Sequence, residues 1–244
     1  MKYRVTPLLA GLALVLTACG APPEARFQWP EAVRDPGALQ FRVVEQTVED
    51  VPGETLKGTA TTLDAVWAKV GPDAAALAQS LTYPAVDPQS MGVLAPFAQL
   101  SPAEIALLPA AVQFNVPYVS CAQLDHRDAQ LPEQAAVACD QKQKYLLGPV
   151  AMNGGDLADV AASFATNGNG WIVTLTFNTA GTQRWADLTS RAVQKQVAII
   201  LGDQILTAPV ILEAMTGGNA EISANFSQDL AVGLADRLRD AVWN

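Results

Sequence analysis

The clearest pattern in the sequence is an alternation of apolar and polar positions in its last hundred residues. Residues 144–152 have the composition of a strand, and residues 159–177 predict a β-hairpin that turns at residues 167–170. In the second strand of this hairpin, every odd position from Trp171 to Phe177 is apolar, and two of the three even positions are threonines. We therefore expect one face of this strand to be buried and the other to be mixed.

Two helical patterns occur in the same half of the chain. Asn178 or Thr179 is placed to cap the first helix, and Ser227 is placed to cap the second. The apolar positions fall on one face of each predicted helix: Trp185, Leu188 and Ala192 in the first, and Leu230, Leu234 and Leu238 in the second.

The remaining strands complete the pattern of the C-terminal half. Residues 196–215 contain two β-rich runs separated by Gly202-Asp203, a pair that suits a hairpin turn, and residues 220–226 predict a further strand. The resulting order is three strands, a helix, three strands and a helix. It predicts an α+β fold in which helices pack on one face of an antiparallel sheet.

The N-terminal half is less regular. Residues 38–49 alternate as a half-buried strand does, with Gln40 and Arg42 on the polar side. Residues 56–119 are rich in alanine and proline and contain short helical patches. In one of these patches Ser101 is placed to cap a helix with Pro102 at its first position and Glu104 at its third. We expect this partly helical region to precede the α+β domain.

The N-terminus has the pattern of an export signal. Lys2 and Arg4 precede an apolar run over residues 8–16, which is too short for an ordinary membrane-spanning helix. The sequence LTACG at residues 16–20 resembles the lipobox of bacterial lipoproteins, so we expect Cys19 to carry lipid; the alternative is a plain secretory signal with a chance cysteine. Residues 19–37 are polar and contain four prolines, as an extended tether does.

These patterns predict four segments. They are a signal peptide (1–18), a lipidated tether (19–37), a lead-in region with a disulfide loop (38–140) and an α+β domain (141–244). We expect the mature protein on the outer face of the cell membrane, held by its lipid anchor.

Two cysteines remain once Cys19 is lipidated. In an oxidising compartment we expect Cys121 and Cys139 to form a disulfide. The alternative is a metal site that combines these thiols with His126. The single histidine and the absence of a Cys-x-x-Cys spacing argue against it.

The charge and the missing motifs exclude several classes of function. The net charge of −9 argues against binding to nucleic acid. The sequence has no serine-hydrolase, zinc-protease or nucleotide-binding motif, and its only histidine, His126, lies in the polar loop between the two cysteines. We therefore expect no catalysis, no cofactor and no metal.

Four segments, in this order and spacing, resemble a known family. They are KYLLGPVAMNG, VTLTFNTAGTQRWADLT, VAIILGDQILTAPVI and GGNAEISANFSQDLAVGLADRL. They resemble the head subdomain of the large extracytoplasmic domain of SecD, the accessory subunit of the Sec protein-export machinery. The residues that fit the family pattern are Phe177, Gly181, Trp185, Thr189, Ala198, Ile199, Leu201, Ala208, Pro209, Gly217, Gly218, Ile222, Asn225 and Phe226.

The sequence also departs from the family pattern. The family's Leu-Asp-Gly turn is Leu201-Gly202-Asp203 here, and Ala224 precedes Asn225 where the family has glycine. The sequence ends at RDAVWN, where the family continues into membrane helices, and it lacks the family's early base-subdomain signature. We therefore expect no proton-driven work. The role that the resemblance implies is transient contact with unfolded polypeptide or with Sec components on the outer face.

Alternative functions are a small-ligand-binding or sensory envelope lipoprotein, a purely structural piece of the envelope and, least favoured, an enzyme. The weakly charged β-rich runs could accept an extended peptide, and the candidate contact residues are Pro209, Ile211 and Met215. The simpler interpretation is that these strands are paired and covered within the fold.

Overall fold

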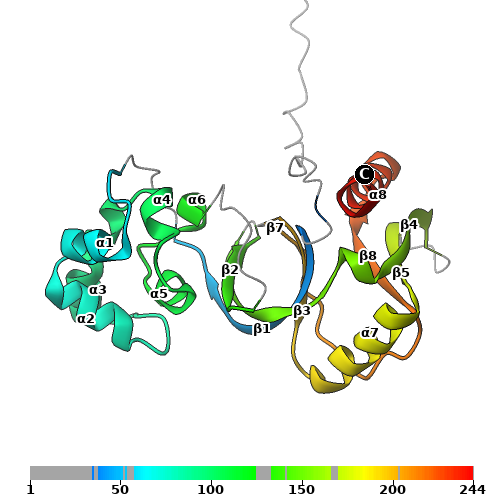
Figure 1. The fold of residues 1–244 in the computed structure, drawn as a ribbon, viewed down its shortest axis with the longest axis horizontal. Coiled ribbons are helices and arrows are strands. Elements are labelled where there is room, and N and C mark those ends of the chain that lie inside the picture. Colours follow the sequence, from blue (N-terminus) through cyan, green and yellow to red (C-terminus); the bar gives the residue numbers. More distant parts are fainter. Residues whose placement is uncertain are drawn as a thin grey trace, which may run out of the picture.

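The structure, a computed structural model, describes residues 35, 38–51, 53, 58–124, 133–140, 142–165, 170–202 and 204–243. Three blocks lie side by side along its longest axis (Figure 1): a helical unit, a β-barrel, and a small sheet with two helices. The expected signal peptide, Cys19, almost all of the tether, and His126 lie outside the described residues.

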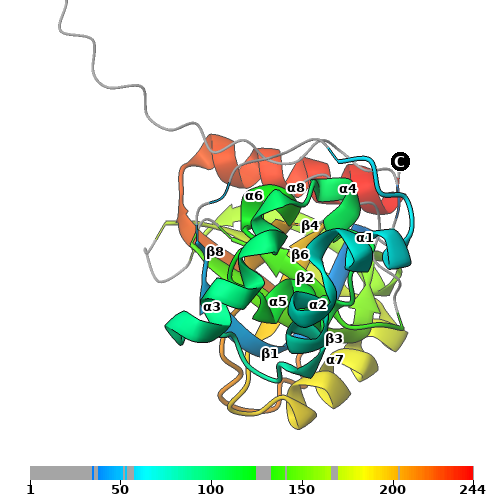
Figure 2. The same cartoon turned by 90° about the vertical axis from the view of Figure 1, so that its left-hand side faces the viewer.

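The helical unit is built from short helices with well-defined starts. Ser101 and Glu104 form a capping box at the start of α4, and Pro102 occupies its first position, as the sequence predicts. Thr62 caps α1 and Asp87 caps α3. The unit packs on the outer face of the barrel wall, against Val48, Val137 and Leu146, and lies in front of the barrel in Figure 2. Its helices are α1 (Leu63–Val70), α2 (Pro72–Ser80), α3 (Pro88–Leu94), the 3-10 helix η2 (Ala95–Gln99), α4 (Pro102–Ile105), α5 (Ala110–Asn115) and α6 (Cys121–Leu124).

The barrel closes because its first strand is long enough to pair on both sides. β1 pairs antiparallel with β3 along most of its length, and residues 39–43 also pair antiparallel with β6. The remaining neighbours are β2 and β7, which meet in a single parallel pair, Cys139 with Gln204. The strand order is β1-β3-β2-β7-β6, with bounds β1 (Leu39–Glu49), β2 (Ala136–Cys139), β3 (Gln143–Asn153), β6 (Val197–Leu201) and β7 (Gln204–Thr207).

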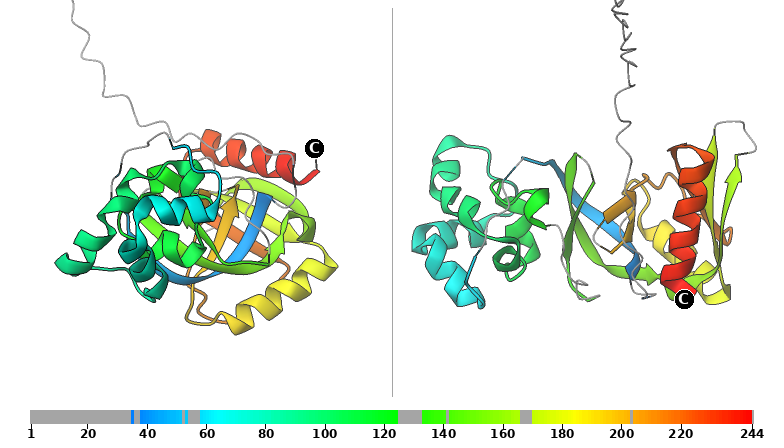
Figure 3. Two further views of the ribbon diagram at one scale, coloured as in Figure 1. Left: turned by 60° about the vertical axis from the view of Figure 1, so that its left-hand side comes forward. Right: turned by 90° about the horizontal axis from the view of Figure 1, so that it is seen from above.

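A second sheet carries the two long helices. Its strand order is β4-β5-β8, and seen from above, α7 and α8 lie between it and the barrel (Figure 3). Trp185 and Leu188 of α7 and Leu234 and Leu238 of α8 are buried there. The bounds are the 3-10 helix η3 (Gly154–Asp156), β4 (Leu157–Phe164), β5 (Trp171–Phe177), α7 (Thr179–Arg191), β8 (Asn219–Phe226) and α8 (Gln228–Trp243).

The fold class predicted from the sequence is confirmed: the protein is α+β, with antiparallel strands and with both long helices on one face of a sheet. The strands form two sheets because β1 recruits β3 and β6 into the barrel. The boundary expected after Asp140 falls between β2 and β3, which are neighbours in that barrel. Of the two proposed caps of α7, Asn178 is the residue that caps it, through its side chain and the N–H of Gly181.

Candidate functional site

The residues predicted to contact a peptide lie in the segment that follows β7. Ile211 is fully buried in the core between barrel and sheet, so its side chain has no surface to offer a peptide. Pro209 is exposed, but its carbonyl oxygen accepts a bond from the N–H of Val197. Met215 is partly exposed, and its N–H donates to Oγ1 of Thr189. The three residues therefore do not form one peptide-binding surface.

An apolar pocket lies between the end of β1 and the helical unit. Its volume is about 270 Å³. Val86 at its rim is 88% exposed and Val51 is 51% exposed, so apolar side chains at the mouth of the pocket are accessible from outside. The residues that line the apolar pocket are Val48, Glu49, Val51, Pro84, Ala85, Val86, Met91, Phe114, Pro117 and Lys144.

The wall of the apolar pocket contains a buried lysine. Nζ of Lys144 donates to the carbonyl oxygens of Gln113 (3.1 Å) and Val119 (2.8 Å) at the end of the helical unit nearest the barrel. It also lies 5.9 Å from the ring centroid of Phe114. Burial lowers the pKa of Lys144 to about 8, although Asp50 acts in the opposite direction. The lysine therefore holds the helical unit against β3, and its ammonium group is already occupied by carbonyl oxygens.

A second hollow lies further along the same strand. This β1 hollow has a volume of about 440 Å³ and is formed by residues 43–47 of β1, residues 194–196 and Val210. Beside it, Val193, Val210 and Leu212 are exposed apolar side chains. The apolar pocket begins at Val48, so the two hollows follow one another along β1.

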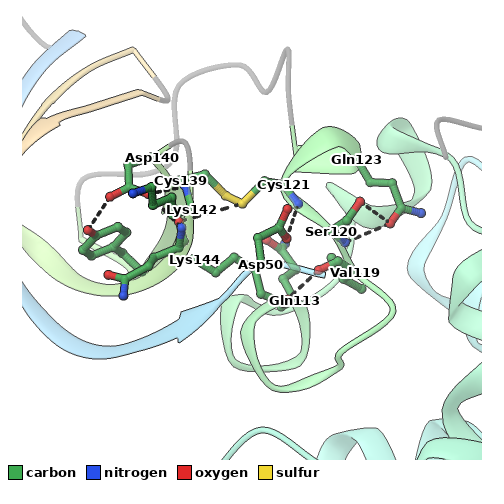
Figure 4. The surroundings of a disulfide bond; sticks show 12 residues. Asp50, Gln113, Val119, Ser120, Cys121, Gln123, Cys139, Asp140, Lys142 and Lys144 are labelled. Atoms are coloured by element: carbon green, nitrogen blue, oxygen red, sulfur yellow. Dashed lines mark hydrogen bonds between the residues drawn. A yellow bond between two sulfur atoms is a disulfide. The ribbon is translucent and has the colours of Figure 1, made fainter. Parts of the chain in front are cut away.

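The disulfide joins the helical unit to the barrel. Cys121 at the start of α6 and Cys139 at the end of β2 are bonded, with their Cα atoms 6.0 Å apart (Figure 4). The N–H of Cys121 donates to Oδ1 of Asp50 (2.8 Å), which follows the end of β1. The bridge thus fixes α6 beside the β1–β3 ribbon that carries the apolar pocket.

We expect the double substitution Cys121→Ser with Cys139→Ser to lower the free energy of unfolding by about 3 kcal/mol, because the closed loop no longer restricts the unfolded chain. Urea denaturation of the oxidised wild type, the reduced wild type and the variant would measure this. The reduced wild type and the variant should agree; an unchanged midpoint in both would contradict the prediction.

The C-terminal half of the chain is similar to known proteins. The family model for the SecDF P1 head subdomain matches residues 129–241. The chain is 37% identical over 122 residues to protein translocase subunit SecD of Streptomyces coelicolor, and 40% identical over 112 residues to that of Acidaminococcus fermentans. These alignments cover 46% and 44% of this chain. Residues 129–241 therefore resemble the SecDF P1 head subdomain, and we call them the SecD head-like domain.

The chain spans 21% of the Streptomyces coelicolor relative and 27% of the Acidaminococcus fermentans relative. Among solved structures, SecDF in its super-membrane-facing form matches with a TM-score of 0.41 and 23% identity, over 84% of this chain and 19% of that one. SecDF of Thermus thermophilus matches with a TM-score of 0.35 and 38% identity, over 40% of this chain and 13% of that one.

The SecD head-like domain supplies only part of the candidate site. Of the residues that line the apolar pocket, only Lys144 falls within it; the others belong to β1 and the helical unit. No pattern in the sequence indicates the apolar pocket, because its apolar residues come from short helices and from loops that are distant in sequence.

Arg42 fills the barrel interior, contrary to its predicted place on the polar side of a strand. It is fully buried; Nη1 donates to the carbonyl oxygens of Gln134 and Gly148, each at 2.8 Å, and Nε donates to Oε1 of Gln40 at the same distance. Burial lowers the pKa of Arg42 to about 10. Its hydrogen bonds link β1 to β3 and to the segment before β2, so Arg42 is a structural residue of the barrel.

Within the described ranges, no group of three or more His, Cys, Asp or Glu side chains is arranged to hold a metal ion. The helices in those ranges do not combine the length and apolarity that a membrane span requires.

Proposed function

We propose that this protein is a non-catalytic, lipid-anchored binding module on the outer face of the cell membrane, and that it assists protein export by contacting translocated polypeptide. The observation that carries the proposal is the apolar pocket with its exposed rim, because unfolded chains present apolar side chains that folded proteins bury. The SecD head-like domain supports the export context, since its relatives are named as subunits of the protein translocase.

Photocrosslinking in living cells tests the contact with polypeptide. We expect a photoreactive amino acid at Val86 to capture an epitope-tagged secreted reporter whose export is stalled by a folded domain fused to its C-terminus. The matched control is the same amino acid at Val232, an exposed valine of α8 that does not line the pocket. Equal capture of the reporter at both positions, or none at either, would overturn the proposal.

The lipid anchor predicts a separate result. We expect Cys19→Ser to move the protein from the membrane fraction to the soluble extracytoplasmic fraction, because Cys19 would carry the acyl chains. Fractionation followed by immunoblotting measures this, and metabolic labelling with a clickable palmitate should label the wild type but not the variant. A variant that stays in the membrane fraction contradicts the anchor.

A small-ligand-binding module is the second candidate, since a cavity of about 270 Å³ with an apolar lining is near the lower size range of ligand sites. A thermal-shift screen would distinguish the ligand-binding function from the polypeptide-binding function. Stabilisation by a small apolar compound, without capture of the reporter at Val86, would favour the ligand-binding function.

A further inference from the structure

The second half of β1 is paired on one side only. β6 accompanies β1 over residues 39–43, and the N–H of Val44 donates to the carbonyl oxygen of Gln196 (2.9 Å) where the chain of β6 begins. Beyond this bond, the described part of the chain places no strand on that side, while β3 continues to pair with β1 as far as Glu49. Among the described residues, the barrel therefore has an open strand edge next to the helical unit.

Backbone groups point outward along this edge. The N–H of Asp50 donates to the carbonyl oxygen of Lys142 (2.9 Å), in the direction of β3. In an antiparallel pair the backbone groups of successive residues point alternately to the two sides. The N–H and C=O groups of Glu49 and Thr47 therefore point away from β3, and both residues are exposed.

The open edge runs past both hollows. The β1 hollow lies beside the start of β6. The apolar pocket lies on the face of β1 toward which Val48 points, against the core of the helical unit. A strand added beside the second half of β1 would lie in line with β6, which pairs with the first half and begins at Val197. The side chain of the added residue opposite Val48 would then face the apolar pocket.

The charges beside the edge favour one kind of strand. Glu45 and Glu49 are exposed on β1 itself, and exposed Asp87 follows Val86 at the rim of the apolar pocket. Lys144 in the apolar pocket is buried and bonded to carbonyl oxygens, whereas Lys195 in the lining of the β1 hollow is exposed. Among these residues, three exposed carboxylates therefore stand against one exposed cation. A segment with basic residues on either side of an apolar one is complementary to this surface.

We propose that an extended polypeptide segment binds by adding a strand to the open edge of β1, with an apolar side chain in the apolar pocket and flanking basic residues beside Glu45 and Glu49. This proposal rests on the proposed function, polypeptide binding, and assigns it a site. Strand addition suits a module that meets many sequences, since the main-chain hydrogen bonds are common to all of them and one pocket selects an apolar side chain.

A labelled peptide tests the mode of binding on the purified soluble chain, residues 20–244. The probe is a fluorescein-labelled nonapeptide of threonine and valine with leucine at position 5 and lysine at positions 4 and 8. When it pairs antiparallel to β1 with the leucine opposite Val48, the lysines lie opposite Glu49 and Glu45. Only alternate amides of an added strand face β1. We therefore expect N-methylation of one alternate set of amides to weaken binding at least tenfold, and N-methylation of the other set to leave it within twofold. Equal effects of both sets would overturn strand addition.

Two pairs of protein variants test the location. Thr47→Pro removes an outward N–H without touching a bond to β3, so we expect it to weaken peptide binding about tenfold, whereas Thr47→Val should bind as the wild type does. Val86→Ser should weaken binding several-fold, and Val232→Ser on α8 should not. Circular dichroism shows whether each variant is folded; if Thr47→Pro is not, Val86→Ser and the N-methylated peptides still decide.

The outcomes separate the two proposals. A second probe is a reduced and carboxymethylated protein that stays unfolded, captured by the wild type in a pull-down. If the wild type captures it but Thr47→Pro and Val86→Ser bind the nonapeptide normally, the β1 edge is the wrong site and the proposed function stands. If the wild type binds neither probe, both the proposed site and the proposed function are wrong.

Discussion

Replacing Gly181 by alanine is expected to lower the free energy of unfolding by about 3 kcal/mol, because α7 approaches the η3 turn too closely for a side chain at this position. A Cβ atom there would collide with the carbonyl oxygen of Asp156. That oxygen cannot easily move, since it accepts the N–H of Asn178 (2.9 Å), while Nδ2 of Asn178 donates to the carbonyl oxygen of Gly155. Urea denaturation followed by tryptophan fluorescence would measure the loss.

The matched control is Gly233→Ala. Gly233 also lies in a helix, α8, but a Cβ atom there would meet nothing within 4 Å. We expect this variant to gain about 0.5–1 kcal/mol, because alanine favours the helix over glycine. If both variants shift the urea midpoint in the same direction, the close approach at Gly181 is not the reason for the glycine.

Replacing Glu104 by glutamine is expected to cost about 3 kcal/mol. The carboxylate of Glu104 is fully buried and accepts the N–H groups of Ser101 (2.8 Å) and Ala60 (3.0 Å) as well as Nζ of Lys69. An amide would turn its own N–H groups toward some of these donors. Lys69→Met is the control. It should cost less than Glu104→Gln, because the N–H groups of Ser101 and Ala60 still stabilise the carboxylate, although that carboxylate is buried and loses its cation.

The same carboxylate predicts a dependence on pH. Burial on its own would raise the pKa of Glu104, but the hydrogen bonds from Lys69, Ser101 and Ala60 outweigh it and lower the pKa from 4.5 to about 2. The folded state then binds fewer protons than the unfolded state between these values. The stabilisation is therefore present above pH 4.5 and is lost as the pH falls toward 2. Urea denaturation across this range should show a shallower decline for Glu104→Gln than for the wild type.

The sequence predicted the elements that repeat a regular pattern. Trp185 and Leu188 are buried at helical spacing in α7, and Val173 and Leu175 are buried at alternate positions in β5, as expected. Ile211 shows a limit of sequence patterns: its apolar run was interpreted as a strand, but β7 ends at Thr207, and the Ile211 side chain is in the core, as the simpler interpretation of a covered segment predicts.

The polar residues were predicted less well, since their surroundings depend on distant parts of the chain. Arg42 and Lys144 have the sequence context of strand residues with solvent-facing charges. They are buried because the barrel and the helical unit bring backbone carbonyl oxygens to them, from Gln134 and Gly148 for Arg42 and from residues of α5 and beyond for Lys144. The peptide site that we propose differs from the candidates in the sequence for a similar reason, since the open edge belongs to β1 and not to the runs after β6.

The position of β1 in the barrel also bears on how the protein reaches its folded state. Leu39 pairs with Leu201, so the strand that closes the barrel is synthesised long before its partner. Contacts between residues so far apart in sequence form slowly, because a long stretch of chain must be ordered before the pairing is gained. β3 is synthesised before β6 and can pair with one edge of β1, but the other edge of residues 39–43 is open to other partners until β6 emerges. A chaperone that covers this edge in the meantime would raise the yield of folded protein.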